Sequence, residues 1–325
     1  MEMNLLSDLA LILISAGIVT IIFKLLKQPL VLGYIVAGFL VGPHFDLFPT
    51  IIEKESVHQW SEIGIIFLMF TLGLEFSFKK LFKVGASAFL TAGAGILLTF
   101  CISFLVGIMM NWSFMESIFL GGMLSISSTT IIIKAFDDLK ITKQRFSDLT
   151  LVVLILQDLV AIIMMVMLST AAVSQKFSGS EMFGSIMKLL FFLVLWFVIG
   201  IAIIPSFFRR TKKYVNDETL LIISIGLCFG MVTFANYVGF SSALGAFVMG
   251  SILSETVEGP HIEKMTQSIK NLFGSIFFVS VGMMVDPKVL GEYWFPILIL
   301  TLLTIFGKTI FNMAGALLSG ENLKD

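Results

Sequence analysis

The chain contains an apolar stretch with a carboxylate at its centre: Leu149-Thr-Leu-Val-Val-Leu-Ile-Leu-Gln-Asp-Leu-Val-Ala-Ile-Ile-Met-Met-Val-Met-Leu168. Its length matches the roughly 20 apolar residues that a helix needs to cross a bilayer. The polar residues at its centre are Gln157 and Asp158. A charge in mid-membrane costs about 3 kcal/mol or more, so a carboxylate retained there usually lines an ion or proton pathway. We therefore predict that Asp158 is a functional group inside a membrane-spanning helix.

The composition is that of an integral membrane protein. Hydrophobic residues make up 57% of the 325 residues and charged residues 13%, against about 25% charged residues in an ordinary soluble domain. The net charge of −1 predicts no nucleic-acid partner. Cys101 and Cys228 lie in apolar segments and are expected to pack as small side chains rather than to form a disulfide or bind a metal. No cofactor is expected.

Ten further stretches are apolar, although 29–47, 60–76 and 240–254 are short or interrupted by glycine, so the sequence predicts a polytopic all-α membrane protein. No segment alternates with period two as a membrane β-barrel strand does, which leaves helices as the spanning elements. The eleven predicted spans are 5–23, 29–47, 60–76, 84–110, 115–134, 147–172, 184–207, 217–236, 240–254, 267–285 and 293–318.

Basic residues fall mainly on one side of this arrangement. When the predicted spans cross the membrane in alternate directions, all but five of the 21 Lys and Arg residues lie in loops on one side of it. The exceptions are Lys54, Lys176, Lys188 and Lys288 on the opposite side and Lys308 within a span. Positive loops collect in the cytoplasm. The pattern predicts a multi-pass protein of the cell membrane with its N-terminus outside and its C-terminus in the cytoplasm.

Two sequence motifs recur in the same order. The run Leu32-Gly-Tyr-Ile-Val-Ala-Gly-Phe-Leu40 is repeated as Leu244-Gly-Ala-Phe-Val-Met-Gly-Ser-Ile252, and Phe67-Leu-Met-Phe-Thr-Leu-Gly73 is echoed by Phe277-Phe-Val-Ser-Val-Gly282. The copies lie seven spans apart, and an odd separation inverts the topology, as in the inverted repeats of secondary transporters.

This repeat predicts one transmembrane transporter domain over residues 1–325. Residues 1–173 form the first repeat, 184–207 a linker helix and 217–325 an incomplete second repeat. The full arrangement would have thirteen spans, so two more are expected beyond Asp325.

A second polar cluster lies in Gly121-Gly-Met-Leu-Ser-Ile-Ser-Ser-Thr-Thr-Ile-Ile-Ile133. The hydroxyl residues favour a local helix break, where hydroxyl and freed carbonyl oxygens could hold a dehydrated cation beside Asp158. The alternative is a helix-packing surface. Lys308 is predicted to be a functional intramembrane charge, the alternative being a side chain that snorkels to the interface.

Several motifs together resemble the monovalent cation:proton antiporters, specifically the Kef-type potassium-efflux branch. The motifs are Leu32-Gly-Tyr-Ile-Val-Ala-Gly-Phe-Leu-Val-Gly-Pro43, Phe67-Leu-Met-Phe-Thr-Leu-Gly-Leu-Glu75, Ser125-Ile-Ser-Ser-Thr-Thr130, Gln157-Asp158 and Phe277-Phe-Val-Ser-Val-Gly-Met283. The resemblance covers most of the chain and implies the inverted-repeat sodium/proton-antiporter-like fold.

The resemblance also implies roles for individual residues. Asp158 would alternately hold a proton and a cation, and Gln157 beside it favours K⁺, with Na⁺ as the other candidate. Ser127, Ser128, Thr129 and Thr130 would lie at the break of a crossing helix, Lys308 would match the family's intramembrane lysine, and Glu75 would be an accessory residue. A core bundle of spans 4–6 and 11 would move against a dimerising bundle of spans 1–3 and 8–10.

These expectations describe a transporter rather than an enzyme, a homodimer in the lipid bilayer that exchanges K⁺ or Na⁺ for H⁺. A cytoplasmic regulatory domain or subunit would lie outside this chain, because no Gly-x-Gly-x-x-Gly motif follows a strand here. The first alternative is a gated monovalent cation channel lined by the same polar residues. A solute symporter ranks lower, because Lys308 is the only spare intramembrane charge. A scaffold without transport leaves Asp158 and Lys308 unexplained.

Overall fold

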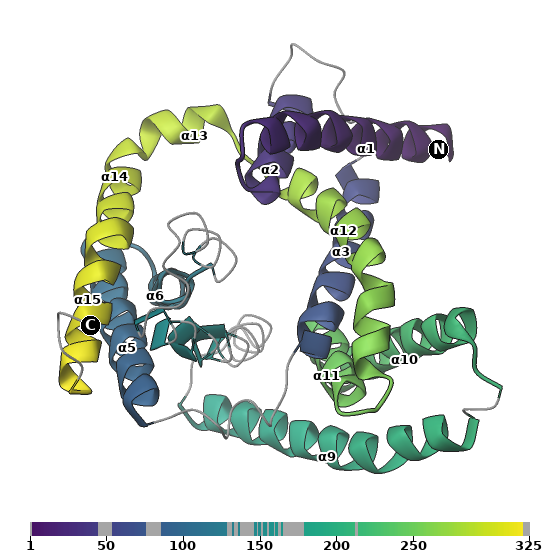
Figure 1. The fold of residues 1–325 in the computed structure, drawn as a ribbon. Coiled ribbons are helices and arrows are strands. Elements are labelled where there is room, and N and C mark those ends of the chain that lie inside the picture. Colours follow the sequence, from purple (N-terminus) through teal and green to yellow (C-terminus); the bar gives the residue numbers. More distant parts are fainter. Residues whose placement is uncertain are drawn as a thin grey trace. The chain divides into compact units, whose positions relative to one another are not determined.

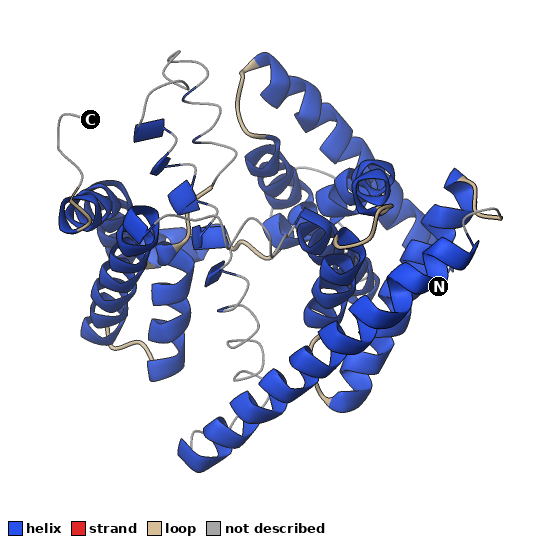
Figure 2. Ribbon diagram, turned by 60° about the horizontal axis from the view of Figure 1, so that its bottom comes forward, coloured by secondary structure: helices blue, strands red, loops and turns tan. Residues whose placement is uncertain are grey.

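The computed structural model describes residues 2–44, 54–75, 86–128, 179–211 and 214–320. It also describes residues 132, 136, 146, 147, 149, 150, 152–154, 156–158, 160, 161 and 164. Within these residues every regular element is a helix (Figure 2). The predicted all-α class is confirmed.

The chain divides into two compact units, each built from two separate parts of the sequence. Unit 1 comprises Met1–Ser77 and Val173–Val289, and unit 2 comprises Phe78–Ala172 and Leu290–Asp325. This division agrees with the two bundles expected from the resemblance.

The helices of the two units are named as in Figure 1. Unit 1 contains α1 (Glu2–Leu25), α2 (Leu30–Val41), α3 (Lys54–Glu75), α9 (Gly179–Thr211), α10 (Asp217–Val238), α11 (Ser242–Ser254) and α12 (Gly259–Met283). Unit 2 contains α5 (Ala86–Met109), α6 (Phe114–Ser125), α14 (Trp294–Leu302), the π-helix η1 (Leu303–Gly307) and α15 (Lys308–Leu318). The short helix α13 (Pro287–Glu292) spans the boundary between the units.

Five helical segments in the described part of the chain are long and apolar enough to cross a membrane. They are Leu6–Leu25, Ala88–Met109, Phe191–Thr211, Asp217–Val238 and Trp294–Leu318. Helices α2, α6 and α11 are apolar but have only 12, 12 and 13 residues, or about 18–20 Å of helix. Each predicted span except 147–172 overlaps one continuous helical segment, and 147–172 is described only at scattered helical residues. The total of eleven spans stays a prediction.

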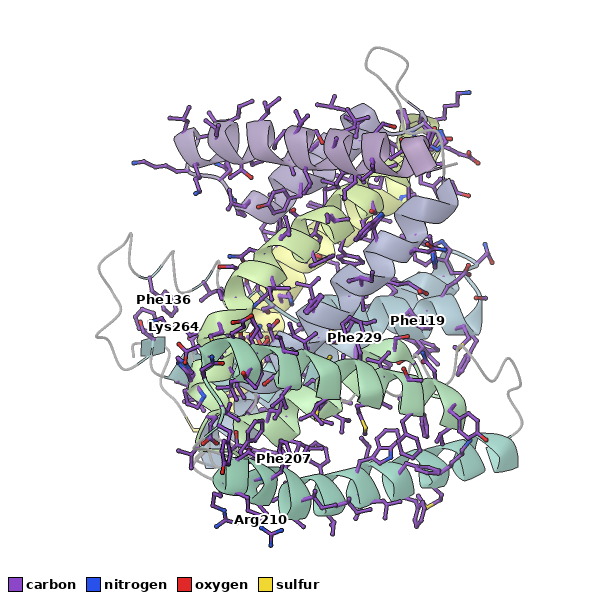
Figure 3. The ribbon with its side chains drawn as sticks, turned by 90° about the vertical axis from the view of Figure 1, so that its right-hand side faces the viewer. Phe119, Phe136, Phe207, Arg210, Phe229 and Lys264 are labelled. Atoms are coloured by element: carbon purple, nitrogen blue, oxygen red, sulfur yellow. The ribbon has the colours of Figure 1, made fainter. Side chains whose placement is uncertain are left out.

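Many large apolar side chains are exposed along these helices. Ile14, Val198 and Ile305 are 61%, 64% and 56% exposed. Such surfaces are rare on soluble monomers and suit contact with lipid. The apolar face of α9 ends in Arg209 and Arg210, and Figure 3 shows Arg210 pointing away from the ribbon.

Close helix crossings at glycines build the core of unit 1. A Cβ atom on Gly38 of α2 would overlap the carbonyl oxygen of Val279 on α12, and one on Gly282 would overlap that of Ile35. Glycine thus lets the two backbones touch, and a small cluster of buried residues from α1, α2 and α12 surrounds this crossing.

Helices α3 and α11 cross in the same way. A Cβ atom on Gly73 would overlap the carbonyl oxygen of Phe247, and one on Gly250 would overlap that of Phe70. Gly38 and Gly250 occupy the same position of the first repeated motif, and Gly73 and Gly282 end the second motif. In each crossing, a helix with the first motif from one repeat packs against a helix with the second motif from the other repeat. Two repeats related by a two-fold axis would produce this crossed pairing.

Candidate functional site

Helix α6 ends within the predicted span 115–134, at Ser125. It begins with a capping box in which Ser113 and Glu116 bond each other's backbone N–H groups. At its other end the Ser125 hydroxyl donates to the carbonyl oxygen of Gly121 at 2.7 Å, and Ile126 is extended with φ −98° and ψ 145°. Residues 126–128 are not helical. The break expected in this span therefore lies directly after Ser125, where hydroxyl side chains compete for backbone hydrogen bonds.

Lys308 lies at this end of α6. It begins α15 directly after the π-helix η1, and its Nζ donates a hydrogen bond to the carbonyl oxygen of Ile126. The last carbonyls of a helix have no intrahelical donor and carry partial negative charge, so a half-buried ammonium group stabilises them. π-Helical turns are frequent at functional sites. The structure thus joins two predicted site elements, Lys308 and the helix break.

The segment that carries Gln157 and Asp158 packs against α5. Val153 and Leu156 are buried in a cluster with Ala88 and Ala92. Gln157 is 2% exposed, and its Oε1 has no hydrogen-bond partner, whereas Asp158 is half-buried. A buried carbonyl oxygen without a donor is costly and needs an explanation. A bound cation or an ordered water would satisfy it.

Gly95 and Ile96 of α5 are the point where three polar segments meet. The Ile96 carbonyl accepts from the Ser125 hydroxyl of α6 at 3.2 Å. The Ile96 side chain packs on the cluster that precedes Gln157 and Asp158. Beside it, the Asn312 side chain of α15 lies against Gly95, and a Cβ atom at Gly95 would meet its Oδ1. One turn of α5 therefore supports the break in α6, the Asp158 segment and the helix of Lys308.

Asn312 is a candidate site residue that the sequence analysis did not identify. Its Oδ1 atom is buried and has no hydrogen-bond partner. It lies one turn after Lys308 on the same helix. The signal available in the sequence was a second polar residue, four positions after the lysine, in an apolar span.

The remaining predicted residues lie in different places. Ser127 is half-buried and Ser128 exposed directly after α6, while Thr129 and Thr130 fall outside the described residues. Glu75 ends α3 in unit 1, where its carboxylate pairs with Lys270 of α12 at 2.9 Å. That pair joins two helices of unit 1, and an accessory role in transport stays a prediction.

A family model described as the transmembrane domain of sodium/hydrogen exchangers matches residues 10–325. The chain therefore belongs to the sodium/hydrogen exchanger family, which confirms the resemblance; the family consists of transporters, not enzymes. The chain also has several long apolar helices and is a multi-pass membrane protein.

Two relatives and one solved structure show how the chain compares. The K(+)/H(+) antiporter subunit KhtU of Bacillus subtilis is 30% identical over 99% of this chain and 80% of its own length. The K(+) efflux antiporter 5 of Arabidopsis thaliana is 31% identical over 95% of this chain, which spans 55% of the plant protein. The sodium proton antiporter MjNhaP1 of Methanocaldococcus jannaschii matches over 99% of this chain and 80% of its own, with a TM-score of 0.75 and 17% identity. That likeness confirms the antiporter-like fold.

Proposed function

We propose that the protein exchanges a monovalent cation for H⁺ across the cell membrane at Asp158. The observation that carries this proposal is the meeting of three polar segments on one turn of α5 at Gly95 and Ile96. The proposed cation is K⁺, with Na⁺ as the alternative. The Gln157-Asp158 pair and the names of the two relatives support K⁺.

The proposed coupling is competition for one carboxylate. Asp158 holds either a proton or a cation, and uncharged oxygens replace the water lost by the cation. The candidate oxygens are the orphaned Gln157 Oε1, the Asn312 Oδ1 and the groups of residues 127–130. Because Gln157 is neutral, Asp158 is the one charged group of the pair, and it binds either one proton or one monovalent cation. Each cycle then exchanges one positive charge for another, so exchange is electroneutral. Lys308 holds the end of α6 and so positions the break.

Alternating access is proposed to occur by movement of unit 2 against unit 1. Unit 2 carries Asp158, the break after α6 and Lys308. The two glycine crossings pack the backbones of unit 1 closely together, so unit 1 is expected to stay rigid while unit 2 moves. A homodimer formed in the membrane and an N-terminus outside are part of the same proposal.

Exchange in proteoliposomes tests the role of Asp158. The full chain is reconstituted with a pH dye inside, and K⁺ is added outside. The wild type is expected to move protons against K⁺, and Asp158→Asn to abolish this movement. Glu218→Gln, which removes an exposed carboxylate from the first turn of α10 in unit 1, is the matched control and should retain exchange.

Two results would overturn the proposal. Undiminished exchange in Asp158→Asn would remove the carboxylate from the mechanism. K⁺ flux without opposing proton movement would make the protein a channel. Repeating the assay with Na⁺, Li⁺ and Rb⁺ identifies the transported cation, and Na⁺ exchange without K⁺ exchange would contradict the K⁺ assignment.

A further inference from the structure

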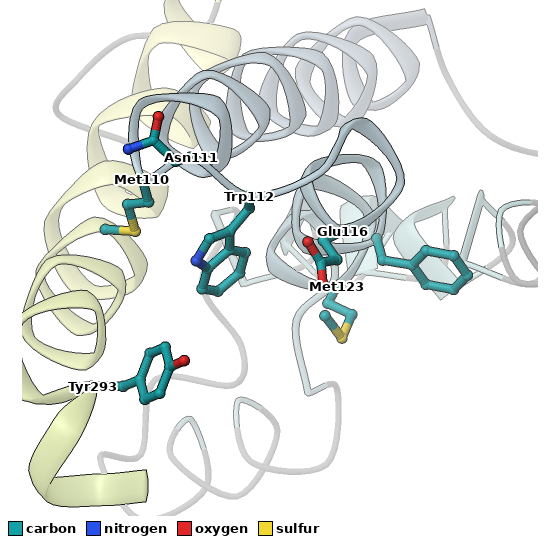
Figure 4. Close-up of a pocket in the computed structure, with 7 residues that line it drawn as sticks. Met110, Asn111, Trp112, Glu116, Met123 and Tyr293 are labelled. Atoms are coloured by element: carbon teal, nitrogen blue, oxygen red, sulfur yellow. The ribbon is translucent and has the colours of Figure 1, made fainter.

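A cavity in unit 2 lies at the turn between α5 and α6 and takes no part in the proposed exchange. Its volume is about 570 Å³ (Figure 4). The lining residues are Met110, Asn111 and Trp112 from the turn, Glu116, Phe119 and Met123 from α6, and Tyr293 just before α14.

The turn itself sets the position of the cavity's carboxylate. Asn111 adopts a left-handed conformation with φ 59°, which asparagine tolerates better than most residues. The next residues form the capping box, in which one Glu116 oxygen accepts from the Ser113 N–H at 2.8 Å. Glu116 is therefore fixed at the first turn of α6 and can accept further hydrogen bonds. Figure 4 shows Glu116 on α6 and Trp112 on the turn that precedes this helix.

The cavity changes from polar to apolar along α6. Asn111 and Glu116 lie at its polar end, and Phe119 and Met123 follow over two turns of the helix, about 10 Å in length. Met123 is 62% exposed. Trp112, Tyr293 and the adjacent Trp294 mark the polar end, as aromatic residues do at membrane interfaces. A ligand with a polar head and an apolar chain would match this order.

The charge of the lining selects the kind of head group. Glu116 is the only charged residue among the seven that line the cavity, and none of them is Lys or Arg. An anionic head group would find no basic partner there. An ammonium group would donate hydrogen bonds to the carboxylate and lie against the aromatic rings.

We propose that this cavity binds a phospholipid with a primary ammonium head group, phosphatidylethanolamine. Its ammonium group contacts Glu116, Trp112 and Tyr293, and one acyl chain follows Phe119 and Met123. The lipid phosphate remains in the hydrated interface.

Native mass spectrometry of the full chain tests this binding directly. The delipidated protein in detergent is mixed with dioleoyl phosphatidylethanolamine, phosphatidylcholine or phosphatidylglycerol. The ethanolamine lipid is expected to give the largest bound fraction. Choline, which cannot donate a hydrogen bond, should bind more weakly, and phosphatidylglycerol weakest.

Glu116→Gln is the decisive variant. Glutamine also serves at this position of a capping box, so helix α6 should be retained while the charge is lost. The variant is expected to bind phosphatidylethanolamine roughly two- to fivefold more weakly and no longer to prefer it over phosphatidylcholine. Trp112→Ala should weaken both ammonium lipids, roughly three- to tenfold.

Glu292→Gln is the matched control, since it removes an exposed carboxylate beside Tyr293 that does not line the cavity. It should bind lipid as the wild type does. Equal binding of phosphatidylglycerol and phosphatidylethanolamine by the wild type, or an unchanged preference in Glu116→Gln, would overturn the proposal. Because the measurement is lipid binding, its outcome does not depend on transport.

Discussion

Lys308 shows how a single basic residue in a span can be accommodated. It is half-buried at the start of α15, and its ammonium group is bonded to the carbonyl of Ile126, a residue 182 positions away. The contact supplies a donor at the end of a helix, where the last carbonyls have no intrahelical partner. We therefore read Lys308 as a positioning residue for the break after α6.

Replacing Lys308 tests this reading. Lys308→Met should lower the thermal unfolding midpoint in detergent, because the loss of a charged hydrogen bond costs about 1–3 kcal/mol. Lys308→Arg keeps a donor and should lose less. Lys288→Met, at an exposed lysine, is the control. A Lys308→Met protein as stable as the control would show that the contact contributes nothing.

Substitution of Asn312 tests whether its side chain serves the fold or binds the cation. An unpaired buried acceptor destabilises a fold, so Asn312→Leu should leave the unfolding midpoint unchanged or raise it. If its Oδ1 binds the cation, the same variant should require a higher cation concentration for half-maximal exchange. Gly95→Ala, whose methyl group would displace Asn312, should show the same cation dependence. Unaltered cation dependence in Asn312→Leu would exclude this oxygen from the site.

At the scale of helices, glycines decide which elements can touch. Gly38 and Gly282 join α2 to α12, and Gly73 and Gly250 join α3 to α11. Substituting alanine at any of the four positions places a methyl group on a neighbouring backbone carbonyl. The expected loss of stability is about 1–3 kcal/mol or more.

The same chain offers controls for these glycine substitutions. Gly17 of α1 and Gly226 of α10 have no atom near the position of an added Cβ. There alanine should be neutral or should stabilise the helix by up to about 1 kcal/mol. Thermal unfolding of the six single variants compares the two groups. Equal midpoints in both groups would show that the crossings are looser than the structure indicates.

At the scale of the whole molecule, the division into two units makes a prediction about movement. The hydroxyls of Thr91 on α5 and Ser319 after α15 are 2.9 Å apart within unit 2. A cysteine pair at these positions is within disulfide reach. If unit 2 moves as one body, cross-linking Thr91→Cys/Ser319→Cys should leave exchange unchanged.

The cross-link is made in a background with Cys101→Ala and Cys228→Ala, the two free cysteines of the chain. Exchange is measured before oxidation, after it and after reduction. Inhibition that reduction reverses would show that α5 and α15 move relative to each other during transport. The uncross-linked double variant controls for the substitutions.

Local features of the sequence predicted the helices, their apolar character and the cost of burying Asp158, because hydropathy and periodicity belong to contiguous residues. They also predicted a break near Ser125, since hydroxyl residues compete for backbone hydrogen bonds. The motif glycines were visible as a repeat, but their crossing partners were not.

Tertiary packing determined what these segments contact. The sequence could not place Lys308 on the end of α6, pair Glu75 with Lys270, or put Asn312 against Gly95, because each contact joins residues far apart in the chain. Such contacts depend on how closely backbones approach, which small side chains permit but do not specify. Asp158 was therefore recognisable as a costly charge, while its support by one turn of α5 required the folded unit.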